Sequence, residues 1–195
     1  MDTLIWPLEP VGPRAARLPD RLVTRAPFAA QGALDLMTAL LLPAGDGVGA
    51  VPHSEGDRSC IGLWLGTPFL PSAPVGAGWI CNFPPASAFD ASFVAEMSEV
   101  ELGPERERAH LAALRAADMR VMLAGSVGMA DPTGADALLI AVRGAGDLEA
   151  LRGGYIGEMR ARLGRDLPCA VFGEEGRLLP RRPEQDGFDA VLRLP

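Results

Sequence analysis

The sequence predicts an α+β fold whose C-terminal half, residues 91–195, forms a ferredoxin-like split β-α-β unit. The first observation is the order strand, helix, strand, strand, helix, strand between Phe93 and Phe172, which is the order of such a unit. The second is the continuous apolar run ALLIAVR at 137–143, typical of a strand in the middle of a sheet. The third is the proline-rich start of the chain, which predicts an extended N-terminal arm.

The first 90 residues divide into two predicted parts. Residues 1–27 contain five prolines, which fix their own φ angles and lack an amide donor, so we expect an arm with at most a short strand at 3–6. Residues 28–90 form an N-terminal α+β part of unknown type, which could share one core with residues 91–195. This part begins with an expected helix at 28–42, which Pro43 ends.

Two apolar strands are expected at 60–69 and 78–83, because both runs carry aromatic or β-branched residues and are bounded by Gly and Pro. Trp64, Trp79 and Phe83 are interpreted mainly as core residues of these strands. The alternative is that the three aromatic side chains line an apolar pocket.

The elements of the C-terminal half follow from local signals. The segment 92–102 fits either a helix or a strand, and we expect a strand in its second half. Pro104 suits the first position of a helix, with Glu105 and Glu107 at the positive end of its dipole. Strands are expected at 120–128, 137–143 and 167–172, and another at 188–194.

A further helix is expected to begin at Asp147, as its N-cap, and to present Leu148, Leu151 and Tyr155 on one face. The glycines at 153, 154 and 157 cost such a helix about 1 kcal/mol each relative to alanine. They therefore indicate a close backbone approach or a break in the helix.

The charge composition excludes several classes of function. The net charge is −7, and all 18 basic residues are arginine. The absence of lysine excludes a lysine Schiff base, a pyridoxal phosphate enzyme and a Walker A loop. No cofactor is expected. An acidic chain with scattered arginines argues against nucleic-acid binding. No apolar run reaches the roughly 18 residues of a membrane span and no secretory signal is evident, so a cytoplasmic location is expected.

The cysteines and histidines point to no strong metal site. The three cysteines are widely spaced and without a CxxC pair, so we expect reduced and mostly buried thiols. His53, Glu55 and Asp57 alternate within one loop and could face a common cation, which makes them candidate metal ligands. A solvated loop that binds no metal contains the same residue types.

One stretch of the C-terminal half resembles a known family through the following residues: Arg108, His110 and Leu111, then Ala124 and Gly125, then Asp131 and Gly134. The stretch is similar to the YciI-like family of the dimeric α+β barrel superfamily. The resemblance implies a homodimer with facing sheets and a pocket in which His110 and Asp131 act as an acid/base pair. Arg108 and Ser126, which stands where the family usually has proline, are the candidate substrate-pocket residues.

Two functions follow as hypotheses. The first is a non-catalytic interaction or assembly protein that docks on a protein partner through its proline-rich arm and apolar strands; the N-terminal half, which shows no catalytic arrangement, favours it. The alternative is a small YciI-like enzyme of the lyase or isomerase type, with His110 as the general base for proton transfer on a small molecule. The structural alternative for the pair is that His110 caps a backbone carbonyl and Asp131 closes its own turn.

Overall fold

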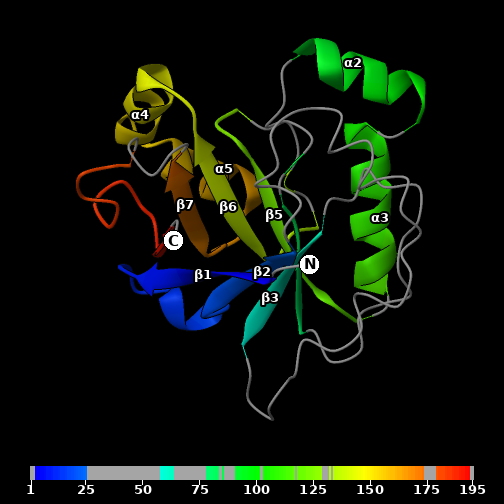
Figure 1. Cartoon of the computed structure of the whole chain (residues 1–195). Coiled ribbons are helices and arrows are strands. Elements are labelled where there is room, and N and C mark those ends of the chain that lie inside the picture. Colours follow the sequence, from blue (N-terminus) through cyan, green and yellow to red (C-terminus); the bar gives the residue numbers. More distant parts are fainter. Residues whose placement is uncertain are drawn as a thin grey trace.

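The computed structural model describes residues 3–25, 58–63, 78–83, 85, 91–101, 103–116, 118–128, 132, 134–173 and 179–193. Within these ranges the strands close into one barrel in the order of the sequence (Figure 1). They are β1 (Thr3–Pro10), β2 (Arg21–Arg25), β3 (Ser59–Leu63), β4 (Trp79–Asn82), β5 (Arg120–Ser126), β6 (Ala137–Val142), β7 (Cys169–Gly173) and β8 (Ala190–Leu192).

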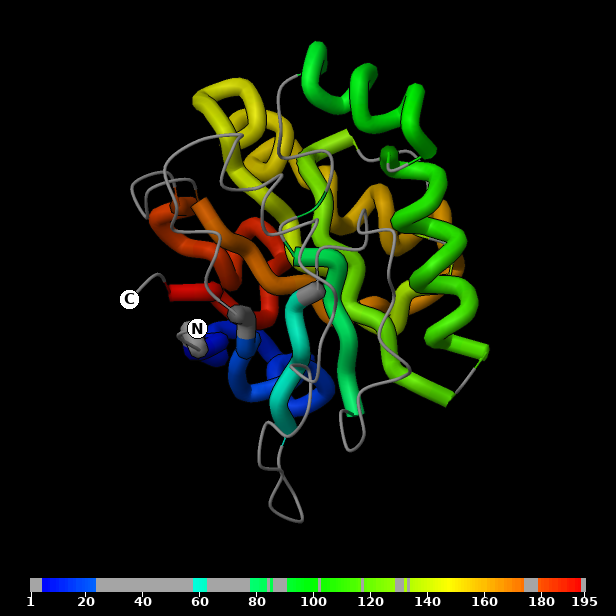
Figure 2. The backbone as a smooth tube through the Cα atoms, turned by 45° about the vertical axis from the view of Figure 1, so that its right-hand side comes forward, coloured from blue at the N-terminus to red at the C-terminus, as the bar shows by residue number. Residues whose placement is uncertain are grey.

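The barrel is parallel except at its first strand. Strands β2 to β8 run parallel to one another, whereas β1 pairs antiparallel with both β2 and β8. The first and last strands thus lie side by side, seen as blue beside red in Figure 2. Because β2 to β8 are parallel, their carboxyl-terminal ends all meet at the same end of the barrel.

The register gives the stagger of this barrel. We trace the register around the barrel by stepping from each residue to its partner on the next strand. Starting at Trp6 of β1, the partners on β2 to β5 are Leu22, Cys60, Trp79 and Arg120. When the same registers are extended beyond the strand ends, the path continues through Ala135, Asp166 and Asp186 to Arg14. The path returns to β1 about eight residues from its start, and a shear of eight in an eight-stranded barrel is that of (β/α)8 enzymes. The interior of such a barrel is filled by side chains.

Helices cover the outside of the parallel strands. The described helices are the 3-10 turn η1 (Ala15–Arg17), α2 (Ala91–Glu99), α3 (Pro104–Ala116), α4 (Ala145–Arg152) and α5 (Tyr155–Leu163). Leu111 and Leu114 of α3 pack on Ile80 and Val121 of β4 and β5. A second outer cluster joins α4 and α5 to β6, β7 and β8, through residues such as Ile156.

Large and small side chains complement one another inside the barrel. Trp79 and Phe83 project from β4 and the residue after it, while Ala137, Ala141 and Ala170 project from β6 and β7. Small residues on one wall leave room for aromatic rings from the other, which gives the dense packing of a protein interior. Both faces of β6 are consequently buried.

The predicted ferredoxin-like split β-α-β unit, and with it the dimeric α+β barrel, is wrong. The strands of the C-terminal half are parallel members of a closed barrel that also includes β1 to β4. The error arises at residues 127–136, because so short a link between strands usually joins an antiparallel pair. Here it joins the parallel strands β5 and β6.

The proline-rich N-terminal arm of the predicted fold is also wrong, because residues 3–10 and 21–25 are barrel strands. The prolines are compatible with strands here. Pro7 lies on the outer face of β1 with Ile5 and Glu9, all three exposed, and Pro10 is the exposed last residue of the strand. The barrel thus draws strands from all three predicted segments, 1–27, 28–90 and 91–195.

Several local predictions are confirmed. The helix begins at Pro104, β6 is buried throughout, and the glycine pair at 153–154 breaks the expected single helix into α4 and α5. The strand expected in the second half of 92–102 is wrong, since 91–99 is helical. The helix expected at 28–42 lies outside the described residues. None of the helices in the described ranges has the length and apolarity to cross a membrane.

Candidate functional site

The parallel strands bring a small group of side chains to their carboxyl-terminal ends. Ser126 ends β5, Arg143 follows β6, Phe83 follows β4 and Phe172 lies next to last in β7. Met122 and Ala124 point into the barrel, so alternation along the strand gives Ser126 the inward phase. We call these four residues the carboxyl-terminal rim.

Aromatic rings form the apolar part of the rim. The rings of Phe83 and Phe172 meet edge to face with centroids 5.3 Å apart, and Trp6 packs against Phe83 at 6.0 Å. Phe83 and Phe172 retain 9% and 8% exposure, whereas Leu139 and Ala170 deeper in the barrel are fully buried. The aromatic group therefore closes the interior, and Phe83 and Phe172 remain slightly accessible to solvent.

Arg143 supplies a positive charge at the rim. Its backbone N–H donates to Asp147 Oδ2 at 2.8 Å, which ties the end of β6 to the first turn of α4. Asp147 is the carboxylate at the helix N-terminus and not, as predicted, the N-cap, which is Gly144. The exposed Arg143 side chain has no ion pair within the described part of the chain.

Two hydrogen-bonding side chains fix the backbone around the rim. The Gly128 N–H donates to Tyr155 Oη at 3.0 Å, so the first residue of α5 anchors the loop that follows Ser126. On β4, the buried Asn82 donates from Nδ2 to the Ala124 carbonyl at 3.0 Å and accepts from the Ala124 N–H at 2.6 Å. The amide of Asn82 thus continues the β4–β5 pairing beyond its last main-chain partners.

His110 lies away from the rim, in the middle of α3 on the outside of the barrel. It is half-buried and follows the buried Glu107 by one helical turn, on the side that also carries Leu111 and Leu114. Its predicted partner Asp131 lies outside the described residues. The acid/base pair therefore stays a prediction.

The other predicted site residues are dispersed. Arg108 is exposed on α3, with Nη2 4.0 Å from Glu105 Oε1, whereas Ser126 is at the rim. The candidate metal ligands His53, Glu55 and Asp57 lie outside the described residues. Within the described ranges, no three His, Cys, Asp or Glu side chains are grouped closely enough to hold a metal ion.

The three cysteines are free and buried, as predicted. Burial raises the pKa of the Cys81 thiol well above its usual value, and contact with Cys60 raises it further. Burial also raises the pKa of Cys169 to about 12, although the nearby Arg160 opposes the shift. Because the thiolate is the nucleophilic form, Cys81 and Cys169 are unsuited to nucleophilic catalysis.

The sequence contains partial signals for the rim. Its pattern makes Phe83 either a core or a pocket residue, and the apolar run of β6 leads directly into Arg143 and the helix-starting segment GAGD. Recognising Arg143 and Tyr155 required knowing that β5 and β6 are parallel, because only then do their following loops share one end of the barrel. No model of a protein family matches the chain, and no curated protein matches it either.

Proposed function

We propose that this protein binds a small organic molecule at the carboxyl-terminal rim of its barrel. The observation that carries the proposal is the closed, mainly parallel barrel, whose strand direction places Ser126 and Arg143 at the same end as Phe83 and Phe172. In parallel barrels of this shear, ligands bind at the carboxyl-terminal face and the opposite face serves stability.

The chemistry of the rim favours a ligand with an apolar or aromatic body and a carboxylate. The edges of Phe83 and Phe172 suit the face of an apolar ring, because aromatic pairs prefer edge-to-face contact. The guanidinium of Arg143 offers the paired donors that recognise a carboxylate, and the Ser126 hydroxyl can donate or accept one hydrogen bond. This proposal keeps the small-molecule part of the enzymatic hypothesis and moves its site from α3 to the rim.

The placement of the N-terminal strands supports this choice over docking through apolar strands. Cys60, Trp79, Ile80 and Cys81 are all buried in β3 and β4, so these side chains offer no surface to a partner. The residues of the expected arm that are described form β1, η1, β2 and their connections.

Saturation-transfer NMR with phenylacetate as the probe tests the proposal, and the neutral analogue phenylacetamide isolates the contribution of charge. We expect transfer to phenylacetate that is stronger than to phenylacetamide. Ser126→Phe should abolish it by filling the rim, and Arg143→Gln should remove the preference for the anion. Arg165→Gln is the matched control, because Arg165 is exposed before β7, at the other end of the barrel.

Circular dichroism of each variant first verifies that it folds, so that loss of binding can be distinguished from loss of structure. Transfer that survives Ser126→Phe, or that is lost equally in Arg165→Gln, would contradict a site at the rim. No transfer to either probe in the wild type would contradict the proposed ligand class.

A further inference from the structure

The barrel has a thin seam where its last strand closes it. Strand β8 is three residues long and has two register pairs with β7 and three with β1. By contrast, β6 has five register pairs with each of its neighbours. Main-chain pairing alone therefore holds β8 less firmly than the central strands.

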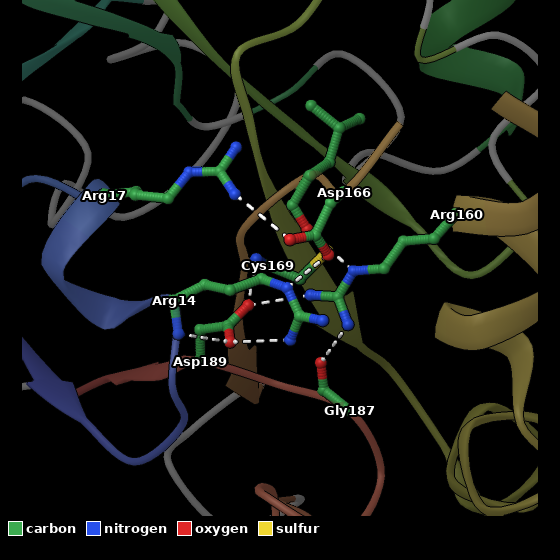
Figure 3. A network of polar contacts seen from close by, with 8 residues as sticks. Arg14, Arg17, Arg160, Asp166, Cys169, Gly187 and Asp189 are labelled. Atoms are coloured by element: carbon green, nitrogen blue, oxygen red, sulfur yellow. Dashed lines mark hydrogen bonds and ion pairs between the residues drawn. The ribbon is translucent and has the colours of Figure 1, made fainter. Parts of the chain in front are cut away.

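A buried carboxylate compensates for the short pairing. Asp189 directly precedes β8 and is fully buried. Its Oδ2 accepts hydrogen bonds from the Cys169 N–H at 2.9 Å and from Arg160 Nη2 at 2.7 Å, and its Oδ1 accepts from the Arg14 N–H at 3.1 Å (Figure 3). One side chain thus joins β7, α5 and the turn that follows β1.

The backbone of Asp189 makes two of these connections, to β7 and to the turn that follows β1. Its N–H donates to the Cys169 carbonyl at 2.7 Å, and its carbonyl accepts from the N–H groups of Val11 and Gly12 at 2.9 and 3.0 Å. The turn also passes very close, since a Cβ atom at Gly12 would lie 2.4 Å from the Phe188 carbonyl oxygen. We call Asp189 with Arg14 and Arg160 the seam clasp.

The two arginines of the seam clasp also bind groups other than Asp189. Arg160 also donates to the carbonyls of Leu167 and Gly187, and Arg14 also pairs with Asp166, an exposed carboxylate. Breaking a buried pair by removing one partner is strongly destabilising, because the remaining charge stays buried and unpaired. Loss of the Asp189 carboxylate therefore removes the side-chain contacts that join β7, α5 and the turn after β1, and leaves Arg160 without its buried partner.

We propose that the barrel opens locally at the β7–β8–β1 seam, with β8 as a detachable strap that the seam clasp keeps shut. Opening uncovers Cys169 on β7 and the inward side chains of Ala190 and Leu192, while the far wall formed by β3 to β6 stays intact. Such openings occur where few contacts oppose them, at free energies below that of global unfolding. This inference is independent of the ligand site at the rim.

The rates at which the three cysteines react with a thiol reagent test whether the seam opens locally. Cys169 lies at the seam, whereas Cys60 and Cys81 lie inside the far wall, and all three are buried. Native protein is treated with N-ethylmaleimide, and each cysteine is quantified by peptide mass spectrometry over time. In Asp189→Asn we expect Cys169 to be modified at least about tenfold faster than in the wild type, with Cys60 and Cys81 lagging behind it.

Asp166→Asn is the matched control, since it removes a carboxylate that contacts Arg14 from outside the buried cluster. We expect its labelling to stay within about twofold of the wild type, because exposed pairs contribute little. Equal acceleration of all three cysteines in Asp189→Asn, or no acceleration of Cys169, would overturn the proposal.

Native-state hydrogen exchange on the wild type tests the seam even if Asp189→Asn does not fold. The amides of Cys169 and Val191 should exchange through an opening of lower free energy than the amide of Leu139 in β6. A single free energy shared by all three amides would overturn the proposal, because the seam would then open only on global unfolding.

Discussion

Replacing Leu139 with alanine probes the closed barrel most directly. Leu139 is fully buried inside the barrel, where its register partners are Ala124 on β5 and Ala170 on β7. Its inward neighbours along β6, Ala137 and Ala141, are alanines as well. Because the residues directly opposite Leu139 and next to it on the inner face of β6 are alanines, they cannot fill the space, and we expect most of the cavity to remain.

The cost of a buried Leu→Ala substitution ranges over about 2–5 kcal/mol and rises with the volume of the cavity that remains. We therefore expect Leu139→Ala to lower the free energy of unfolding by about 4–5 kcal/mol. Ile5→Ala is the control, because Ile5 is 51% exposed on the outside of β1, and it should cost less than about 1 kcal/mol.

Leu138 extends the test to the other face of β6. It packs among the outer cluster that includes Ile156 and Met159 of α5, and Leu138→Ala should cost at least about 2 kcal/mol. A sheet covered on one face would bury only one of these two adjacent leucines. Urea unfolding followed by tryptophan fluorescence measures all three variants. A cost below about 1.5 kcal/mol for either leucine would refute a barrel that is packed on both sides of β6.

Three further predictions concern polar groups and pH. Asn82→Leu should lower the free energy of unfolding by about 2–4 kcal/mol in urea unfolding, because the buried N–H and C=O of Ala124 lose their partner; a loss under 1 kcal/mol would mean that they find others. The folded pKa of Cys169 is raised to about 12, so its contribution to stability should be complete below about pH 9 and lost as the pH rises towards 12. Thermal melts of wild type and Cys169→Ala measure this, and identical alkaline profiles would contradict it. The hydrogen bond from Arg14 lowers the pKa of Asp166, so this carboxylate should stabilise the fold above its ordinary pKa and lose that effect as the pH falls through the lowered value. Melts of wild type and Asp166→Asn at pH 2–5 should therefore converge at the acid end, and parallel curves would argue against the pair.

The sequence was a good guide to elements whose signals are local. The helix start at Pro104, the break at the paired glycines and the buried run of β6 depend on backbone geometry and apolar content within a few residues. The strand that the sequence predicts in the second half of 92–102 is wrong, because the apolar spacing there fits both periods and the turn at 103–104 can follow either a strand or a helix. Local patterns predict whether a segment forms a helix or a strand, and they fail where the apolar residues fit the helical and the strand period equally well.

The candidate site was harder to predict than the elements. A family resemblance points to Ser126, whereas nothing in the sequence around Arg143 or Tyr155 marks either residue as part of a site. Their relevance depends on loops meeting at one end of the barrel, which follows from strand direction. The seam clasp was equally hidden, since Arg14 and Asp189 are 175 residues apart in the chain.

Composition and neighbouring residues are enough to predict most of the helices and strands, the burial of the cysteines and the exclusion of lysine chemistry. The parallel direction of the strands, the place of the proline-rich start in the barrel, and the side chains that share the rim and the seam become visible in the folded structure alone. Strand direction and barrel closure depend on pairings between residues far apart in the chain. Such pairings are selected by the packing of the whole interior, so the sequence of one segment does not reveal its partner strand.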